Sequence, residues 1–177
     1  SCPNNPDHRI SMGGNYSFDE YYSKLCSFKT IHHDLLYGIP FANESIPHIY
    51  SSHFLEHLFL KDCEFLLKEC WRVLNHGGLI RIVIPSLDDE VRAIREAVIQ
   101  YECGNIAPIQ KYVTSDIVGY NSKFSNHRHM YNYNGIKRLL VEVGFIEVSQ
   151  KDYKLGDIPD VELLDSRNGI FIEGKKP

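Results

Sequence analysis

The spacing of apolar positions predicts alternating strands and helices in the first half of the chain. Residues 46–54 (IPHIYSSHF) and 79–84 (LIRIVI) are short and rich in β-branched side chains, as strands are. Between them, residues 62–75 place apolar side chains on one helical face: Leu66, Cys70, Val73 and Leu74. Because a helix joins them, we expect the two strands to be adjacent, parallel and buried.

Turn and capping residues give provisional ends to these elements. Asp62 is expected to cap the helix, and Gly77-Gly78 to end it, since glycine adopts a left-handed conformation at no steric cost. Residues 37–41 (YGIPF) are expected to turn the chain before the first strand.

The second half of the chain predicts two further helices. Ser86 and Asp89 have the spacing of a capping box, which opens a helix with one apolar stripe: Leu87, Val91, Ile94, Val98 and Tyr101. Residues 104–130 are rich in Tyr, Asn, Ser and His and predict a loop. A helix is then expected over residues 134–143, with Gly144 past its end.

The order of elements predicts an α/β fold. Strands over residues 145–150 and 169–173 complete the pattern and can pair in antiparallel fashion. Alternating strands and helices indicate a mostly parallel sheet covered by helices. We expect residues 1–30 to form an irregular N-terminal segment and residues 31–177 to form the α/β domain.

Composition excludes several classes of protein. The 177 residues carry a net charge of −4, with 43% apolar and 24% charged side chains, so nothing indicates a disordered chain or a nucleic-acid partner. No apolar stretch is long enough to cross a membrane. The five cysteines are odd in number and none has Cys-x-x-Cys spacing, so we interpret them as reduced thiols in a cytoplasmic protein.

The motif His53-Phe-Leu-Glu56-His57 has the composition of a metal-binding motif. On a helix, the two histidines would share a face and could bind zinc, with Glu56 as general base of a hydrolase. The preceding residues predict a strand, however, which puts His53 at a strand end and away from such a face. We therefore expect no metal there, with Leu55 packed inward and Glu56 capping backbone amides.

The ends of the strands direct attention to a ligand site. In open α/β sheets, ligands bind outside the carboxyl ends of the strands. Those positions hold Ser51, Ser52 and His53 after one strand and Pro85-Ser86 after the next. Asp34 ends a short apolar segment, and its carboxylate can accept hydrogen bonds from a ribose hydroxyl or an exocyclic amine; the alternative is a turn-forming Asp.

Two long segments together resemble one enzyme family. The stretches HDLLYGIPFANESIPHIYSSHFLEHL and LLKECWRVLNHGGLIRIVIP, with Gly144-Phe145 and the terminal IFIEGKKP, are similar to class I S-adenosylmethionine-dependent methyltransferases with Leu-Glu-His after the fourth strand. The resemblance covers about residues 31–101 and 127–177. It implies a Rossmann-like sheet, mostly parallel with an antiparallel C-terminal strand, and S-adenosylmethionine as the cofactor.

The resemblance also implies roles for individual residues. Asp34 would accept from the adenine amine, with Leu35 beside the ring. The loop formed by Ser51, Ser52 and His53 would lie along the cofactor. His57 would face the cleft, and the loop His127-Arg-His-Met-Tyr131 would cover the substrate or, alternatively, form a surface loop anchored by Tyr131. His57 or His127 is the candidate base for the methyl acceptor, a small molecule or a sugar.

One part of the family pattern is not evident. Neither the glycine-rich loop after a first strand nor the acid after a second strand can be found, and Met12–Asn15 is the only candidate loop. We expect the first strands to lie upstream of Ser1 or to be missing, and this chain to bind S-adenosylmethionine weakly or not at all. A non-catalytic domain that associates with a partner domain or a second copy, and a zinc hydrolase using His53 and His57, stay as alternatives.

Overall fold

The computed structural model describes residue 31, residues 33–111 and residues 127–177. The chain divides into two units, residues 1–34 and 35–177, and nearly all described residues belong to the second. The candidate glycine loop at Met12–Asn15 lies outside the described residues. The expectation of a domain boundary after residue 30 stays a prediction.

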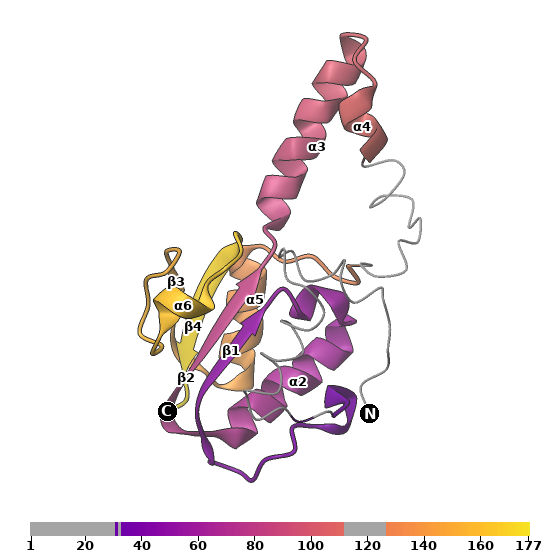
Figure 1. The fold of residues 1–177 in the computed structure, drawn as a ribbon. Helices are drawn as coiled ribbons and strands as arrows, with labels where there is room; N and C mark the ends of the chain where they lie inside the picture. The colour runs from indigo at the N-terminus through magenta and orange to yellow at the C-terminus, as the bar shows by residue number, and fades with distance from the viewer. Residues whose placement is uncertain (1–30, 32, 112–126) are drawn as a thin grey trace, which may run out of the picture. The chain divides into compact units, whose positions relative to one another are not determined.

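Among the described residues, four strands form one sheet in the order β1-β2-β4-β3 (Figure 1). They are β1 (Ile46–Ser52), β2 (Leu74–Ile84), β3 (Ile146–Lys151) and β4 (Ile170–Lys175). β1 and β2 pair in parallel, whereas β4 is antiparallel to both of its neighbours. Within these four strands three therefore run one way and the C-terminal strand runs the other, which confirms the predicted directions. β1 is only partly buried along its length, however, so the expectation that both parallel strands are buried is wrong for β1.

Two amphipathic helices cover one face of this sheet and enclose the core. α2 (Leu60–Val73) and α5 (Tyr133–Val143) contact each other as well as the sheet. In α5, Ile136 and Leu140 are fully buried, the Asn132 side chain accepts from the Gly135 N–H at 2.9 Å, and Gly144 ends the helix with φ of 116°. The predicted end of this helix at Gly144 is thus confirmed.

The ends predicted for α2 are wrong, for a local reason. The helix begins at Leu60, because the carbonyl of Phe59 accepts the N–H groups of Asp62 and Cys63 at 3.0 Å, so Asp62 lies in the first turn and is not the cap. At the other end the chain enters β2 at Leu74, and Gly77 takes its left-handed φ of 76° inside β2. The glycine conformation was predicted correctly, but it belongs to an irregularity in strand pairing.

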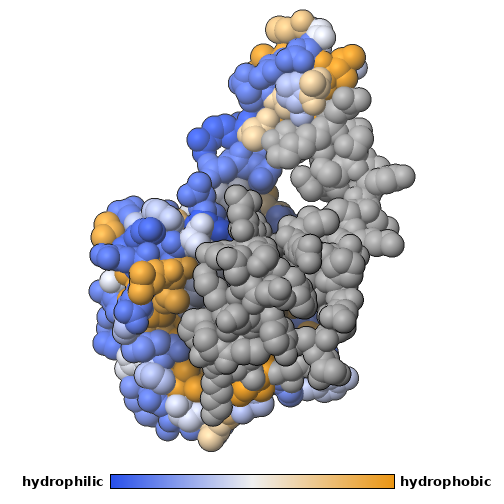
Figure 2. Space-filling model, viewed as in Figure 1, coloured by the Kyte–Doolittle hydropathy of each residue, from blue (hydrophilic) through white to orange (hydrophobic). Residues whose placement is uncertain are grey.

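The apolar stripe of the next helix is exposed over most of its length. α3 (Leu87–Glu102) begins as predicted, with the Ser86 hydroxyl accepting from the Asp89 N–H at 3.2 Å. Within α3, however, only Ala97 is buried. A short helix, α4 (Ala107–Lys111), follows inside the predicted loop. Figure 2 shows apolar side chains at the surface of this α3–α4 end.

The opposite face of the sheet carries a buried ion-pair network. Arg81 of β2 donates to both Asp165 oxygens, at 3.0 and 2.5 Å, and to Glu173 of β4 at 2.8 Å. None of these three side chains is more than 3% exposed. The segment that holds Asp165, including α6 (Val161–Leu164), is therefore fixed to the sheet by charge-assisted hydrogen bonds.

Two expectations from composition can be followed in the described part of the chain. Cys63 and Cys70 are buried among apolar side chains, and burial raises the pKa of the Cys70 thiol to about 12. Cys103 is exposed, whereas Cys2 and Cys26 lie outside the described residues. No helix in the described ranges has the length and apolar character needed to cross a membrane.

Candidate functional site

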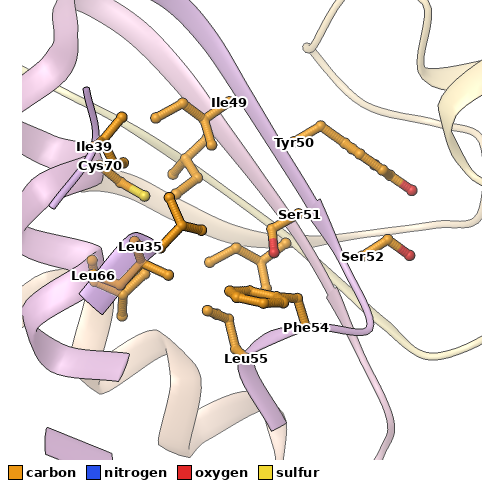
Figure 3. Close-up of a pocket in the computed structure, with 13 residues that line it drawn as sticks. Leu35, Ile39, Ile49, Tyr50, Ser51, Ser52, Phe54, Leu55, Leu66 and Cys70 are labelled. Atoms are coloured by element: carbon orange, nitrogen blue, oxygen red, sulfur yellow. The ribbon is translucent and has the colours of Figure 1, made fainter. Parts of the chain in front are cut away.

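A pocket of about 320 Å³ lies at the carboxyl end of β1, between the sheet and α2 (Figure 3). Its walls are largely apolar side chains from the turn before β1, from β1 and β2, and from α2; they include Leu35, Ile39, Ile49, Leu55, Leu66 and Cys70. Ligand sites are typically apolar concavities with a few polar groups. The pocket therefore has the character of a site for a largely apolar group.

Alternation along β1 separates the two predicted serines. Figure 3 shows the Ser51 hydroxyl turned toward Phe54 and Leu55, whereas the Ser52 side chain points to the opposite side of the strand. Ser51 can thus hydrogen-bond a group in the pocket. Ser52 can contribute backbone there, because successive side chains of a strand face opposite ways.

A salt bridge on α2 holds the turn that carries Leu35 and Ile39. This turn consists of a 3-10 helix, η2 (Leu35–Tyr37), followed by residues 38–43. Glu69 accepts the Ile39 N–H at 2.9 Å and pairs with Arg72 at 2.7 Å. Arg72 in turn donates to the carbonyl groups of Ile39 at 2.8 Å and Phe41 at 2.9 Å. One wall of the pocket is therefore attached to α2 by polar side chains.

The local electrostatics and sterics fit this arrangement. The hydrogen bond from Arg72 lowers the pKa of the Glu69 carboxyl to about 2 from an ordinary value of 4.5. Gly38 has a φ of +94°, and a Cβ there would lie 2.7 Å from Glu69 Oε2. The turn thus requires glycine at this position, both for its backbone conformation and for the close approach of the carboxylate.

Two of the predicted cofactor residues do not line the pocket. His53 has a φ of +50°, and its Nε2 lies 3.0 Å from the carbonyl oxygen of Asn168. Its Nδ1 faces Glu56 Oε1 at 3.5 Å. Asp34 is exposed and directly precedes Leu35, at the end of the first unit. The roles of both residues stay predictions.

The two candidate bases, by contrast, lie together. The ring centroids of His57 and His127 are 5.1 Å apart, and the ring planes are inclined at 68°. His57 follows Leu55 and Glu56 in a 3-10 helix, η3 (Leu55–His57), directly after the pocket-lining end of β1. The sequence assigned them separately, one to the cleft and one to a covering loop, and the structure brings both to one point.

Backbone hydrogen bonds fix this meeting of distant segments. The carbonyl of Glu56 accepts the N–H groups of Arg128 at 2.7 Å and His129 at 3.2 Å. Tyr131 is 3% exposed, and its carbonyl accepts the Leu87 N–H at 2.9 Å. Burial also raises the pKa of the Tyr131 phenol. The loop is thus anchored by Tyr131, as one of the two sequence interpretations held, and it also adjoins the carboxyl ends of β1 and β2.

Sequence reasoning misjudged Glu56. Its side chain is 1% exposed, and neither carboxylate oxygen has a hydrogen-bond partner in the described ranges, so it does not cap backbone amides as expected. The Glu69–Arg72 pair was also missed, although its spacing of three residues on a helix is a recognisable signal.

Comparison with known proteins agrees with this architecture. Residues 17–82 match the family model for a methyltransferase domain. A solved SAM-dependent methyltransferase from Archaeoglobus fulgidus aligns with a TM-score of 0.54 and 16% identity, over 90% of this chain and 73% of that one. The chain has a class I methyltransferase fold. The resemblance and fold class predicted from the sequence are thereby confirmed, and S-adenosylmethionine is supported as the cofactor.

Two further structures share the methyltransferase fold. PigF with SAH aligns with a TM-score of 0.50 and 12% identity, over 81% of this chain but only 34% of PigF. A chain of a Haloferax volcanii complex that contains the Trm112 methyltransferase activator aligns with a TM-score of 0.52 and 13% identity, over 91% of this chain and 69% of that one. No curated protein matches the sequence. At these identities the structural likeness establishes the fold alone.

Proposed function

We propose that this domain transfers a methyl group from S-adenosylmethionine to a small-molecule or sugar acceptor. The observation that carries the proposal is the apolar pocket at the carboxyl end of β1, in a chain with a methyltransferase fold. The sulfonium cofactor supplies the activated methyl group. At about 320 Å³ the pocket is at the small end of ligand sites, so it suits the nucleoside part of the cofactor.

The pocket walls support a division of roles. Leu35 and Ile39 offer an apolar surface for an adenine ring, and the Ser51 hydroxyl offers a hydrogen bond inside the pocket. In the proposed site Asp34 accepts from the adenine amine, while the backbone of Ser52 and His53 continues along the cofactor. Arg72 and Glu69 do not touch the cofactor; they hold the wall that does.

The acceptor would lie beside His57 and His127. Methyl transfer needs the donor carbon and the acceptor atom aligned, so much of the rate enhancement comes from positioning. An imidazole within hydrogen-bond reach of the acceptor can also take up its proton. Both rings lie beside the end of β1 that lines the pocket, and both are accessible to solvent. His57 is 35% exposed.

Calorimetric titration with S-adenosylhomocysteine tests the placement of the cofactor. Ser51→Val removes the hydroxyl in the pocket, and we expect at least about a fivefold loss of affinity from one lost hydrogen bond. Ser149→Val on β3 is the matched control, because Ser149 is half-buried on a strand that does not line the pocket. Equal affinities for both variants would place the cofactor elsewhere.

A further inference from the structure

Three potential metal ligands from distant parts of the chain converge beside the pocket. Glu56, His57 and His127 each offer one ligand atom, and these atoms all lie within 4.8 Å of one another. Glu56 Oε1 and His57 Nε2 are 3.9 Å apart. The cluster combines one carboxylate with two imidazoles, so it is not merely a group of surface acids.

The negative charge of the buried Glu56 carboxylate is poorly compensated. Both of its oxygens lack a hydrogen bond in the described part of the chain, and the side chain is 1% exposed. A buried carboxylate without compensation is costly. His53 Nδ1 lies 3.5 Å from Glu56 Oε1, and the other ring nitrogen of His53 already contacts the Asn168 carbonyl oxygen at 3.0 Å.

We propose that Glu56, His57 and His127 bind one divalent transition-metal ion. Two imidazoles and a carboxylate are the ligand set of catalytic zinc sites and of related open sites for first-row metals. Around a tetrahedral zinc ion, ligand atoms lie roughly 3.3–3.5 Å apart, so small side-chain rotations close the present spacing. Three protein ligands leave a position open for an external oxygen atom.

Backbone hydrogen bonds hold the segments that carry the ligands close together. Because the carbonyl of Glu56 accepts the N–H groups of Arg128 and His129, the loop that carries the third ligand is bonded to the residue that carries the first. His57 is 35% exposed and His127 is exposed, which gives the ion a route from solvent. Such preparation lowers the cost of bringing the ligands together.

This site differs from the zinc motif considered in the sequence. There His53 and His57 would be the ligands and Glu56 the base, whereas here Glu56 is a ligand and His127 replaces His53. Metal binding itself is independent of methyl transfer. The role of the ion rests on the proposed function. With His57 and His127 as ligands rather than bases, the ion would bind the acceptor oxygen and lower the pKa of its hydroxyl, whose proton would pass to water.

Titration of the metal-free 177-residue chain with Co²⁺ tests the proposal without any cofactor. We expect one Co²⁺ per chain, visible in the cobalt absorption spectrum, without the charge-transfer band that a thiolate ligand would give. His57→Ala and His127→Ala should each weaken binding at least about tenfold. His129→Ala, two residues away from His127, should leave the affinity within about threefold, because the His129 side chain is outside the cluster.

Several results would overturn the site. The first two are the absence of a cobalt absorption spectrum and the presence of a thiolate charge-transfer band. The third is an equal loss of Co²⁺ affinity in His127→Ala and His129→Ala, and the fourth is a loss of Co²⁺ affinity in His53→Ala with none in His127→Ala. The last result would point to the His-x-x-Glu-His pair. Failure of S-adenosylhomocysteine binding would affect only the role of the ion, so the two proposals fail separately.

A stability measurement removes the ambiguity of a misfolded variant. Glu56→Gln keeps the shape of the side chain and removes its charge. Without metal, it should unfold at a higher temperature than the unaltered chain, and it should lose the stabilisation that added Co²⁺ gives. A lower unfolding temperature would mean that the Glu56 carboxylate is already stabilised in the metal-free chain, and it would refute the metal site.

Discussion

Arg72 is the residue whose loss should disturb the pocket most without touching a ligand. Its side chain donates five hydrogen bonds: two to Glu69 and one each to Ile39, Phe41 and Asn43. The bonds to Phe41 and Asn43 are exposed, so water replaces them, whereas the three to Glu69 and Ile39 are partly buried. At roughly 1 kcal/mol each, Arg72→Met should lower the free energy of unfolding by about 2–3 kcal/mol.

The effect should extend to ligand binding. Without the guanidinium, the turn that carries Leu35 and Ile39 loses most of its attachment to α2. If only about a tenth of the molecules then have the turn in its binding-competent conformation, the affinity for S-adenosylhomocysteine falls about tenfold. Arg72→Lys keeps the charge but not the forked geometry, and it should give an intermediate loss.

The assay for the Arg72 variants combines urea unfolding with calorimetric titration. Trp71, the single tryptophan of the chain, lies next to Arg72 and reports unfolding by its fluorescence. Arg138→Met is the control, because Arg138 forms an exposed pair with Glu142 and should change neither quantity. An Arg72→Met variant with unaltered stability, or with lost stability and unaltered affinity, would refute the reasoning.

Three other residues give predictions for stability. The pKa of Glu69 is lowered to about 2, so the ionised carboxylate stabilises the fold above about pH 4.5, and this stabilisation is lost as the pH falls toward 2. In urea unfolding, the unaltered chain should be more stable than Glu69→Gln by about 1–2 kcal/mol at pH 7, and this difference should shrink near pH 3. Gly38→Ala should cost about 1–3 kcal/mol in thermal unfolding, and an unchanged midpoint would contradict the strained turn. Arg81→Met leaves Asp165 and Glu173 buried without a cation and should cost about 3–5 kcal/mol in urea unfolding; a cost below about 1 kcal/mol would contradict it.

The strands and their directions were predictable because their signals are local. The β-branched run of residues 79–84 and the helix before it sufficed to pair β1 with β2, and the paired C-terminal strands followed from the same periodicity. Helix ends were less predictable. The start of α2 depends on a backbone carbonyl of Phe59, and its end depends on strand pairing of Leu74, neither of which a residue type reveals.

The candidate site was predictable only in part. Leu35 and Ser51 were found because a strand end and a family resemblance mark them. The meeting of His57 with His127 depends on hydrogen bonds between segments some seventy residues apart. The lack of a hydrogen bond to the Glu56 carboxylate within the described ranges depends on burial. Neither feature can be read from the spacing of residues along the chain. The sequence therefore suggested the pair His53 and His57 within one motif, whereas the structure brings His57 together with His127.

In the proposed function, the pocket between β1 and α2 binds the nucleoside part of the cofactor. Methyl-group NMR of the isotopically labelled chain, with saturating S-adenosylhomocysteine, tests it directly and detects even weak binding. We expect shifts in the methyl signals of Leu35, Ile39 and Ile49, and none at Ile158, which does not line the pocket. An unchanged spectrum, or shifts at Ile158 with none at Leu35, Ile39 and Ile49, would contradict the claim.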